Sequence, residues 1–395
     1  MEAKTEFTVD GHLLRLVHQP KERLSALLSL INEAQSSIQL VIYIYQADQT
    51  GLEVLDALAA AAKRGVNVRL LIDSFGSSEM RDSFFAPLAE AGGTYRWFSS
   101  KWNVGYFVRN HQKMVVVDGE KALIGGFNIA DDYFGRAGDD SWEDFGLLIE
   151  GDQVAQLSAH SDRLFDSAEG GGVRFLQLRH MINHWDAGKG RLRWLLGGPT
   201  NRISPWAMQL KNDLEQGKRL DMVCAYFTPT QAILRRISRL TRQDGKGVII
   251  FPGKTDNGAT IGAARSLYTY LLKRGARLFE FTPRPLHTKL LVIDDAAYIG
   301  SANLDVRSLF INMEIMLRIE DAQLAEYLRG LIATMAEESE AQTLELHRAR
   351  KNWFNRLRWG LAYLLVGGID FTIGRRIRFR RLRSKTKSLP SDAPD

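Results

Sequence analysis

Along this chain, apolar runs typical of strands alternate with apolar residues at helical spacing, which predicts strands separated by helices. In the first part, a strand, a helix and a strand are predicted at residues 38–45, 51–62 and 66–72. In the later part, the same order returns at residues 220–227, 231–241 and 248–251. Strands that alternate with helices indicate an α/β fold with parallel or mixed sheets.

The repeated order predicts two similar α/β/α halves, at residues 1–170 and 195–335, packed around one shared site. Glycine-rich segments at residues 169–172 and 197–199 indicate a connecting region, which we place at residues 171–194. With 395 residues, 45% of them hydrophobic and 25% charged, the chain is long enough for two such halves. Because both halves belong to one chain, a monomer could build the complete site.

Two segments that begin 176 residues apart repeat one polar pattern. The first contains His111, Lys113, Asp118, Gly125 and Asn128, and the second contains His287, Lys289, Asp294, Gly300, Ser301 and Asn303. In each, an apolar run and a turn predict a hairpin that carries the asparagine back toward the histidine. Histidine and lysine two residues apart lie on the same face of a strand. The second copy is one residue shorter, which predicts a tighter hairpin.

Paired histidines suit phosphodiester chemistry. One imidazole can attack phosphorus to form a phosphohistidine, and a second can protonate the departing alkoxide. Lysine and asparagine supply charge and donors for the non-bridging oxygens, so the scheme needs no metal or other cofactor. His180 and His184 have a spacing that suits metal ligands, but no third ligand is near them in the sequence, and we predict no metal site.

Each histidine needs a partner that holds its tautomer. Candidates occur at similar offsets, since Asp144 lies 33 residues after His111 and Glu314 lies 27 residues after His287. The motif aspartates, Asp118 and Asp294, lie at the turn ends of the predicted strands, roughly 16 Å from the lysines. We therefore predict that these two are turn or salt-bridge residues rather than catalysts.

A lone H-x-K on a strand is usually a solvated surface pair. Two copies with the same Asp, Gly and Asn offsets are an internal repeat, which is itself a sign of organisation. The repeated motif resembles the phospholipase D superfamily, whose H-x-K-x4-D motif occurs twice in each active site. The run Gly300-Ser-Ala-Asn-Leu-Asp-Val-Arg307, continued by Asn312-Met-Glu314, is similar to bacterial cardiolipin synthases of the phospholipase D type. The other similar segments are residues 42–45, 63–73, 109–113, 125–128, 142–144, 225–229 and 252–256.

The resemblance implies a two-step phosphatidyl transfer, in which two phosphatidylglycerol molecules would give cardiolipin and glycerol. It implies His111 as nucleophile and His287 as general acid and then base, although the nearly symmetric local sequences leave the reverse assignment open. The residues implied to hold the phosphate are Lys113, Lys289, Asn128 and Asn303. Gly126 stands where the family often has serine, whereas Ser301 retains it, so a hydroxyl contact with substrate would come from the second half alone.

Charge is concentrated at the C-terminal end. Residues 348–395 contain 13 Lys or Arg and 3 Asp, a net charge of +10, so residues 1–347 carry −4 of the total of +6. Within this part, apolar residues share a predicted helical face, and the uncharged run of 11 residues at 359–369 is too short to span a bilayer. The residues of that face are Trp353, Leu357, Leu361, Leu364 and Leu365. We expect residues 336–395 to form a helical basic tail that lies on an anionic membrane, with Arg356 and Arg358 near lipid phosphates.

These features predict phospholipids and an anionic membrane surface as partners, without nucleic acid. Because the start of the chain has no apolar h-region, we expect no secretory signal, and we place the protein at the cytoplasmic side of a bacterial inner membrane, peripheral or monotopic. The single cysteine, Cys224, excludes an internal disulfide and is expected to be inert core. Trp102, Tyr106 and Phe107 are candidates for an apolar lip or for core.

Three alternatives stay open at this point. The same histidines could serve a phospholipase D-type hydrolase, because the sequence does not show how well the site excludes water. They could serve a nuclease whose basic tail binds phosphates. A non-enzymatic membrane-binding protein is disfavoured by the intact histidines and lysines in both copies.

Overall fold

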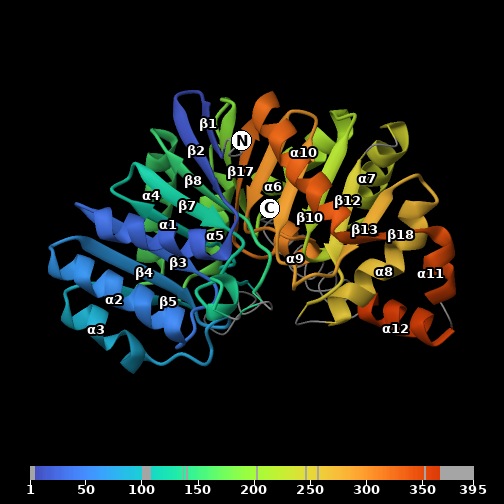
Figure 1. The fold of residues 1–395 in the computed structure, drawn as a ribbon. Coiled ribbons are helices and arrows are strands. Elements are labelled where there is room, and N and C mark those ends of the chain that lie inside the picture. Colours follow the sequence, from blue (N-terminus) through green and yellow to red (C-terminus); the bar gives the residue numbers. More distant parts are fainter. Residues whose placement is uncertain are drawn as a thin grey trace, which may run out of the picture.

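The computed structural model describes residues 5–99, 108–136, 138, 141–201, 203–244, 247–255, 258–350 and 353–364. They form two eight-stranded sheets that lie side by side, with helices packed against both faces of each sheet (Figure 1). The first sheet has the order β1 (Glu6–Val9), β2 (His12–Val17), β8 (Gly146–Glu150), β7 (Lys121–Gly125), β6 (Met114–Val117), β3 (Ser37–Ile42), β4 (Asn67–Asp73) and β5 (Thr94–Phe98). This confirms the predicted α/β class.

The second sheet has the order β18 (Ser339–Gln342), β13 (Arg277–Phe281), β12 (Val248–Pro252), β10 (Leu220–Cys224), β14 (Lys289–Ile293), β15 (Ala296–Gly300), β17 (Glu314–Glu320) and β9 (Leu192–Gly197). Seven of its strands, from β9 across to β13, repeat the order of β2 to β5 in the first sheet, while β1 and β18 are added at opposite edges. In each sheet the strands joined through helices pair in parallel, and the hairpin strands pair antiparallel. A small additional sheet pairs β11 (Phe227–Thr228) with β16 (Leu304–Asp305).

Helices cover both sheets. Those of the first half are α1 (Pro20–Glu33), α2 (Gln49–Lys63), α3 (Ala86–Glu90), α4 (Gln153–Ser167) and α5 (Phe175–Asn183). Those of the second half are α6 (Pro205–Gln216), α7 (Gln231–Asp244), α8 (Gly258–Leu272), α9 (Val306–Phe310), α10 (Ala322–Glu337), α11 (Leu344–Arg350) and α12 (Trp353–Tyr363). Several begin at a capping side chain: Asp48 accepts the Gly51 N–H before α2, and Asp321 accepts the Leu324 N–H before α10.

The boundaries of the second half differ from the expected range. The second sheet begins at Leu192, inside the predicted connecting region, and β18 adds residues 339–342 as its outermost strand. The segment after residue 335 is therefore not all tail. Backbone pairing of β18 with β13 draws this segment into the sheet, which hydrophobic periodicity does not reveal.

One hydrophobic core crosses the border between the halves. Val116 and Ile124 of the first sheet and Ile299 and Ile315 of the second belong to the same buried cluster. Burial of apolar surface stabilises such contacts by roughly 25 cal/mol per Å². The two sheets are consequently held together along the strands that carry the repeated motifs.

The motif aspartates occupy the hairpin turns, as predicted. Asp118 and Asp294 both have positive φ, of 55° and 48°. The Asp118 carboxylate accepts the backbone N–H groups of residues 35, 36 and 37 at 2.7–2.9 Å, and Asp294 accepts those of residues 218 and 219. Burial alone would raise the pKa of Asp118, but these N–H donors lower it. The second turn is the tighter one, because Ile293 pairs with Ala296, whereas Val117 pairs with Lys121.

Candidate active site

The two H-x-K segments meet at the border between the halves. Lys289 begins β14, but His111 and Lys113 lie just before β6, so the first motif precedes its strand instead of starting it. Lys289 pairs with Cys224 of β10, whereas the pairing of β6 with β3 ends at Met114. The His111 backbone N–H donates across the border to the Met313 carbonyl at 2.9 Å. Both histidines are buried, with exposed fractions of 9% for His111 and 4% for His287.

Two short parallel bridges join the halves beside the histidines. Asn110 pairs with Met313, and Glu143 pairs with Leu286. The His287 N–H donates to the Glu143 carbonyl at 2.8 Å, which repeats the bond that His111 makes. Each bridge places the residue before a histidine next to the residue before a carboxylate. The bridges therefore place Asp144 and Glu314 beside the histidine of the opposite half.

The orienting carboxylates are exchanged between the halves. Asp144 Oδ2 lies 2.8 Å from Nδ1 of His287, and the Glu314 oxygens lie 3.0 and 3.1 Å from Nδ1 of His111. The sequence offsets had suggested the opposite pairing, Asp144 with His111 and Glu314 with His287. That pairing is wrong, because Asp144, just before β8, and Glu314, at the start of β17, each reach over the border between the sheets rather than back along their own half.

The two carboxylates differ in electrostatic environment, although neither is exposed to solvent. Burial would raise the pKa of Asp144, but His287, Lys289 and Arg23 together hold it below its usual value. Burial raises the pKa of Glu314 to about 8, although Lys113 and the hydroxyls of Ser301 and Ser308 favour the ionised form. The Asp144–His287 pair thus has the more strongly ionised carboxylate.

Burial and nearby positive charge favour the neutral form of both histidines. Burial, followed by the positive charge of Lys113, lowers the pKa of His111 well below its ordinary value. Burial and Lys289 lower the pKa of His287 to about 3, against the opposing effect of Asp144. A neutral imidazole that donates its Nδ1 proton to a carboxylate keeps Nε2 free to attack phosphorus or to accept a proton.

Two buried lysines add positive charge between the histidines. The ammonium of Lys113 donates to the His111 carbonyl at 2.7 Å, and that of Lys289 donates to the His287 carbonyl at 2.5 Å. Burial, together with the charge of Lys289, lowers the pKa of Lys113 to about 7 against the attraction of Glu314. An ammonium has three donors, so each lysine retains N–H groups for the oxygens of an anionic phosphodiester.

The asparagines are not equivalent. Asn128 accepts the Ile44 N–H at 3.2 Å and donates to the Tyr133 hydroxyl at 3.0 Å, so its amide supports the scaffold. The amide oxygen of Asn303 is buried and has no hydrogen-bond partner within the described part of the chain. Buried polar atoms are normally paired. Asn303 is therefore the amide with unused capacity for a substrate group.

Gly126 and Ser301 contact the carboxylates rather than an open phosphate site. A Cβ on Gly126 would lie 2.6 Å from Asp144 Oδ1, so a serine does not fit there. The Ser301 hydroxyl donates to Glu314 at 2.5 Å and accepts the Ile315 N–H at 3.1 Å. The expected hydroxyl contact with substrate is thus replaced by support of Glu314.

Aromatic rings enclose both imidazoles, and the sequence analysis missed them. The ring of Tyr43 lies edge-on to His111 at 4.8 Å, and those of Tyr133, Trp142 and Tyr226 lie at 5.2, 5.3 and 6.1 Å from His287. Tyr43, Trp142 and Tyr226 lie inside the segments similar to cardiolipin synthases, which was a usable signal, whereas Tyr133 lies outside them. The candidate lip of Trp102, Tyr106 and Phe107 lies outside the described residues.

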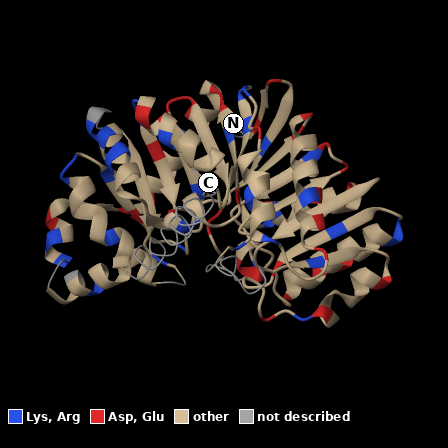
Figure 2. Cartoon of the chain, turned by 180° about the vertical axis from the view of Figure 1, so that it is seen from behind, with Lys and Arg blue, Asp and Glu red and all other residues tan. Residues whose placement is uncertain are grey.

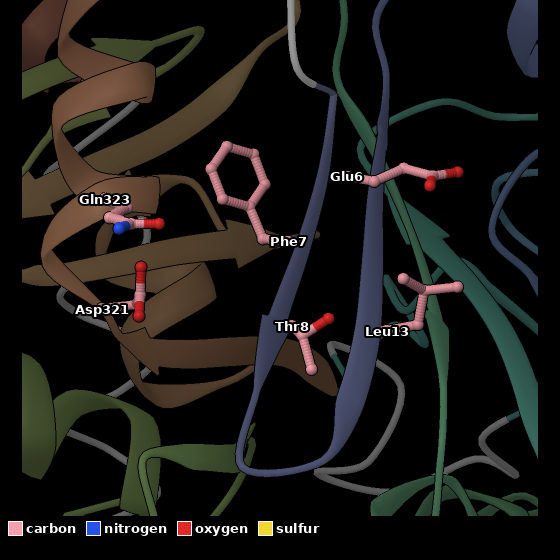
Figure 3. Close-up of a pocket in the computed structure, with 6 residues that line it drawn as sticks. All are labelled: Glu6, Phe7, Thr8, Leu13, Asp321 and Gln323. Atoms are coloured by element: carbon pink, nitrogen blue, oxygen red, sulfur yellow. The ribbon is translucent and has the colours of Figure 1, made fainter.

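Other features lie away from this chemistry. A hollow of about 340 Å³ between the β1–β2 hairpin and α10 is lined by residues of both halves but contains neither histidine (Figure 3). Cys224 is buried, its thiol donates to the Tyr226 carbonyl, and burial raises its pKa to about 12, which suits an inert thiol. Across the residues that the structure describes, no three His, Cys, Asp or Glu side chains gather as metal ligands.

Comparison with known proteins gives this arrangement a family context. The family model described as "Cardiolipin synthase, PLD-like domain" matches residues 27–166 and 210–335. Cardiolipin synthase 1 of Bacillus anthracis is 34% identical over 78% of this chain, and the match spans 63% of that relative's length. The major cardiolipin synthase ClsA of Bacillus subtilis is 31% identical over 91% of this chain and 76% of its own. Cardiolipin synthase B of Escherichia coli K12 is 29% identical over 92% of this chain and 90% of its own length.

A solved structure shows the same fold. Phosphatidylserine synthase of Haemophilus influenzae superposes with a TM-score of 0.69 over 97% of this chain and 96% of its own, at 16% identity. Each of the two phospholipase D-like regions matched by the family model contains one H-x-K segment and one exchanged carboxylate.

Proposed function

Because the chain belongs to the cardiolipin synthase family with phospholipase D-like domains, we propose that it is a phosphatidyltransferase that makes cardiolipin from two phospholipids. The observation that carries the proposal is the exchanged pairing of Asp144 with His287 and Glu314 with His111. It places two oriented imidazoles and two buried lysines in one site. The choice of phospholipid substrates rests on the names of the relatives.

In the proposed first step, Nε2 of His111 attacks the phosphorus of a phosphatidylglycerol. The bond from phosphorus to the glycerol oxygen breaks, and His287 supplies the proton to that oxygen, so that glycerol leaves and a phosphatidyl-histidine remains. Because the free imidazole of His287 is neutral, it must first take up a proton, which the negative phosphate and the ionised Asp144 both favour.

In the second step, His287 removes a proton from a hydroxyl of a second phosphatidylglycerol. The hydroxyl oxygen attacks phosphorus, the phosphorus–nitrogen bond to His111 breaks, and cardiolipin forms. Lys113 and Lys289 stabilise the non-bridging oxygens in both steps. The low exposure of both histidines supports transfer to a lipid alcohol rather than to water.

We also propose that the protein meets its substrates at an anionic membrane surface through α12. Trp359 and Ala362 hold this helix on α8, since a Cβ at Gly262 would lie 3.3 and 3.2 Å from them. The opposite face exposes the large apolar side chains Trp353, Phe354, Leu357, Leu361 and Leu364. Exposed apolar residues on a helix within a basic segment are typical of interfacial helices. We name these five residues the apolar face of α12.

The membrane proposal modifies the expected tail. The helix packs against α8 of the second half. Leu365 and the basic residues 375–387 lie outside the described residues. On the described chain, Lys and Arg are interspersed with Asp and Glu over both halves (Figure 2). No described helix is long and apolar enough to cross a bilayer.

A direct assay tests the enzymatic proposal. Purified protein is incubated with labelled phosphatidylglycerol in anionic vesicles, with EDTA, and the lipids are separated. Cardiolipin and glycerol are the expected products. Phosphatidic acid alone would instead identify a phospholipase D-type hydrolase, and DNA cleavage without lipid turnover would identify a nuclease.

A further inference from the structure

Arg23 on α1 is a fully buried arginine whose five hydrogen bonds all go to backbone carbonyl oxygens. Its guanidinium donates to the carbonyls of Tyr133 at 2.7 and 3.2 Å, Trp142 at 2.9 Å, Asp144 at 2.5 Å and His18 at 2.8 Å. Three of these four acceptors lie 110 to 121 residues away in the sequence. A buried charge is costly unless its surroundings compensate it, so this arrangement calls for an explanation.

The distant acceptors are the residues that surround His287. Asp144 orients its Nδ1, and the rings of Tyr133 and Trp142 lie edge-on to its imidazole while stacking on each other at 5.6 Å. A guanidinium presents its donors in a rigid planar fork, which a lysine cannot reproduce. Arg23 therefore connects three parts of the His287 environment through one rigid group.

The other histidine has no such support within the described residues. Glu314, which orients His111, receives the hydroxyls of Ser301 at 2.5 Å and Ser308 at 2.8 Å directly on its carboxylate. These donors are neutral. Lysine charge acts on both carboxylates, but Arg23 adds a positive charge and backbone hydrogen bonds on the Asp144–His287 side, whereas Glu314 is held by two hydroxyl groups.

We propose that Arg23 is a positioning residue for His287, which fixes Asp144 and the enclosing rings and supplies a positive charge behind the Asp144 carboxylate. This proposal rests on His287 acting as the acid and base of the proposed reaction. An ionised, immobile Asp144 holds the imidazole in one tautomer and stabilises the imidazolium that protonates the leaving group. Lys113, Lys289 and Arg307 lie near His111, and their positive charge favours the neutral imidazole that attacks phosphorus.

The charge and the fork of Arg23 can be separated by substitution. R23M and R23Q remove both, whereas R23K keeps the charge but cannot make the same set of hydrogen bonds. Arg64 is the control, because its guanidinium also donates to three backbone carbonyls, those of residues 31, 32 and 34, at the outer end of α2. R64K and R64M thus test the loss of such bonds away from the histidines.

The pH profile is the decisive measurement. Loss of a positive charge raises the pKa of neighbouring groups. In the profile of kcat against pH, R23M and R23Q should therefore move the limb that reports the Asp144–His287 pair to higher pH by about one unit. R23K should leave that limb in place and lower kcat by about tenfold with KM unchanged, because the imidazole is less well held. The other charged and titratable groups around the pair are His18, Lys113, Tyr133, Glu143, Arg284 and Lys289.

The assay uses the full chain with two substrates, phosphatidylglycerol vesicles and soluble bis(p-nitrophenyl) phosphate. If the lipid is not turned over but the soluble diester is, the proposed function fails, while the role of Arg23 is still measured in the second step, where His287 acts as the base that activates water. Identical normalised profiles for wild type and the neutral variants would overturn the proposal. If neither neutral variant folds, R23K decides alone: wild-type kcat would overturn it, and a lower kcat at unchanged KM would support it.

Discussion

Glu314 and His111 are 203 positions apart and belong to different halves, yet the carboxylate oxygens of Glu314 lie 3.0 and 3.1 Å from the His111 imidazole. Asp144 and His287 repeat this relationship in the opposite direction. Each half therefore contributes one histidine to the site and completes the other. Each imidazole is oriented by a carboxylate of the other half, so we propose that the catalytic unit is the pair of halves.

Substitution of either histidine should stop lipid turnover, and trapping separates their roles. H111A and H287A are each expected to lower kcat by about 10²- to 10⁴-fold, the range of a lost acid, base or nucleophile. A p-nitrophenyl phosphodiester needs little help from an acid, because its leaving group is already a weak base. H287A should therefore still form a phosphoenzyme with it, and H111A should not. A phosphoenzyme found at His287 in H111A would reverse the assignment.

E314Q should lose activity and gain relative stability at high pH. Because the pKa of Glu314 is raised to about 8, the folded protein retains there a proton that the unfolded chain releases above about pH 4.5, so wild-type stability falls as pH rises through this window. The variant lacks this loss and should gain about 2 kcal/mol relative to wild type between pH 6 and pH 9. Urea unfolding at the two pH values measures the difference.

D144N is the matched control for E314Q. The pKa of Asp144 is lowered, so its carboxylate stays ionised from pH 6 to pH 9 in both the folded and the unfolded chain. Its destabilisation should be the same at the two pH values. A pH-dependent gain in D144N as large as that in E314Q would contradict the electrostatic difference between the two pairs.

D118A should destabilise the protein without changing its chemistry. The variant leaves the N–H groups of residues 35, 36 and 37 without their acceptor, at a cost of about 1–3 kcal/mol. The midpoint of urea unfolding should fall, while kcat per folded molecule should equal that of wild type. A large loss of kcat at full folding would give Asp118 a catalytic role that its position in the turn does not support.

The apolar face of α12 should govern binding to vesicles. The double variant L357S/L361S removes two exposed apolar side chains and should weaken binding to anionic vesicles by about tenfold or more in a sedimentation assay. L176S is the control, because Leu176 on α5 is equally apolar and 65% exposed but lies in the first half. Equal binding of the double variant and wild type would show that α12 is not the docking element.

The spacing of apolar residues along the chain was sufficient to predict many of the strands and helices. The strands at residues 37–42 and 67–73 and the helix between them were anticipated within a few positions, because apolar periodicity is a local property of the chain. The same holds for the hairpins, since Asp118 and Asp294 adopt the positive φ that turns favour. The edge strand at residues 339–342 was missed because pairing with a distant strand, rather than its own hydrophobicity, places it in the sheet.

The sequence by itself determined which residues have the chemistry: two histidines, two lysines and two carboxylates in a repeated pattern. Only the tertiary structure decided their partners, because the bridges from Asn110 to Met313 and from Glu143 to Leu286 cross the border between the halves. It also showed that Ser301 supports Glu314 and that Arg23 supports the surroundings of His287. Hydrogen bonds between residues more than 100 positions apart depend on how the sheets pack, and spacing along the chain does not encode that packing in a readable form.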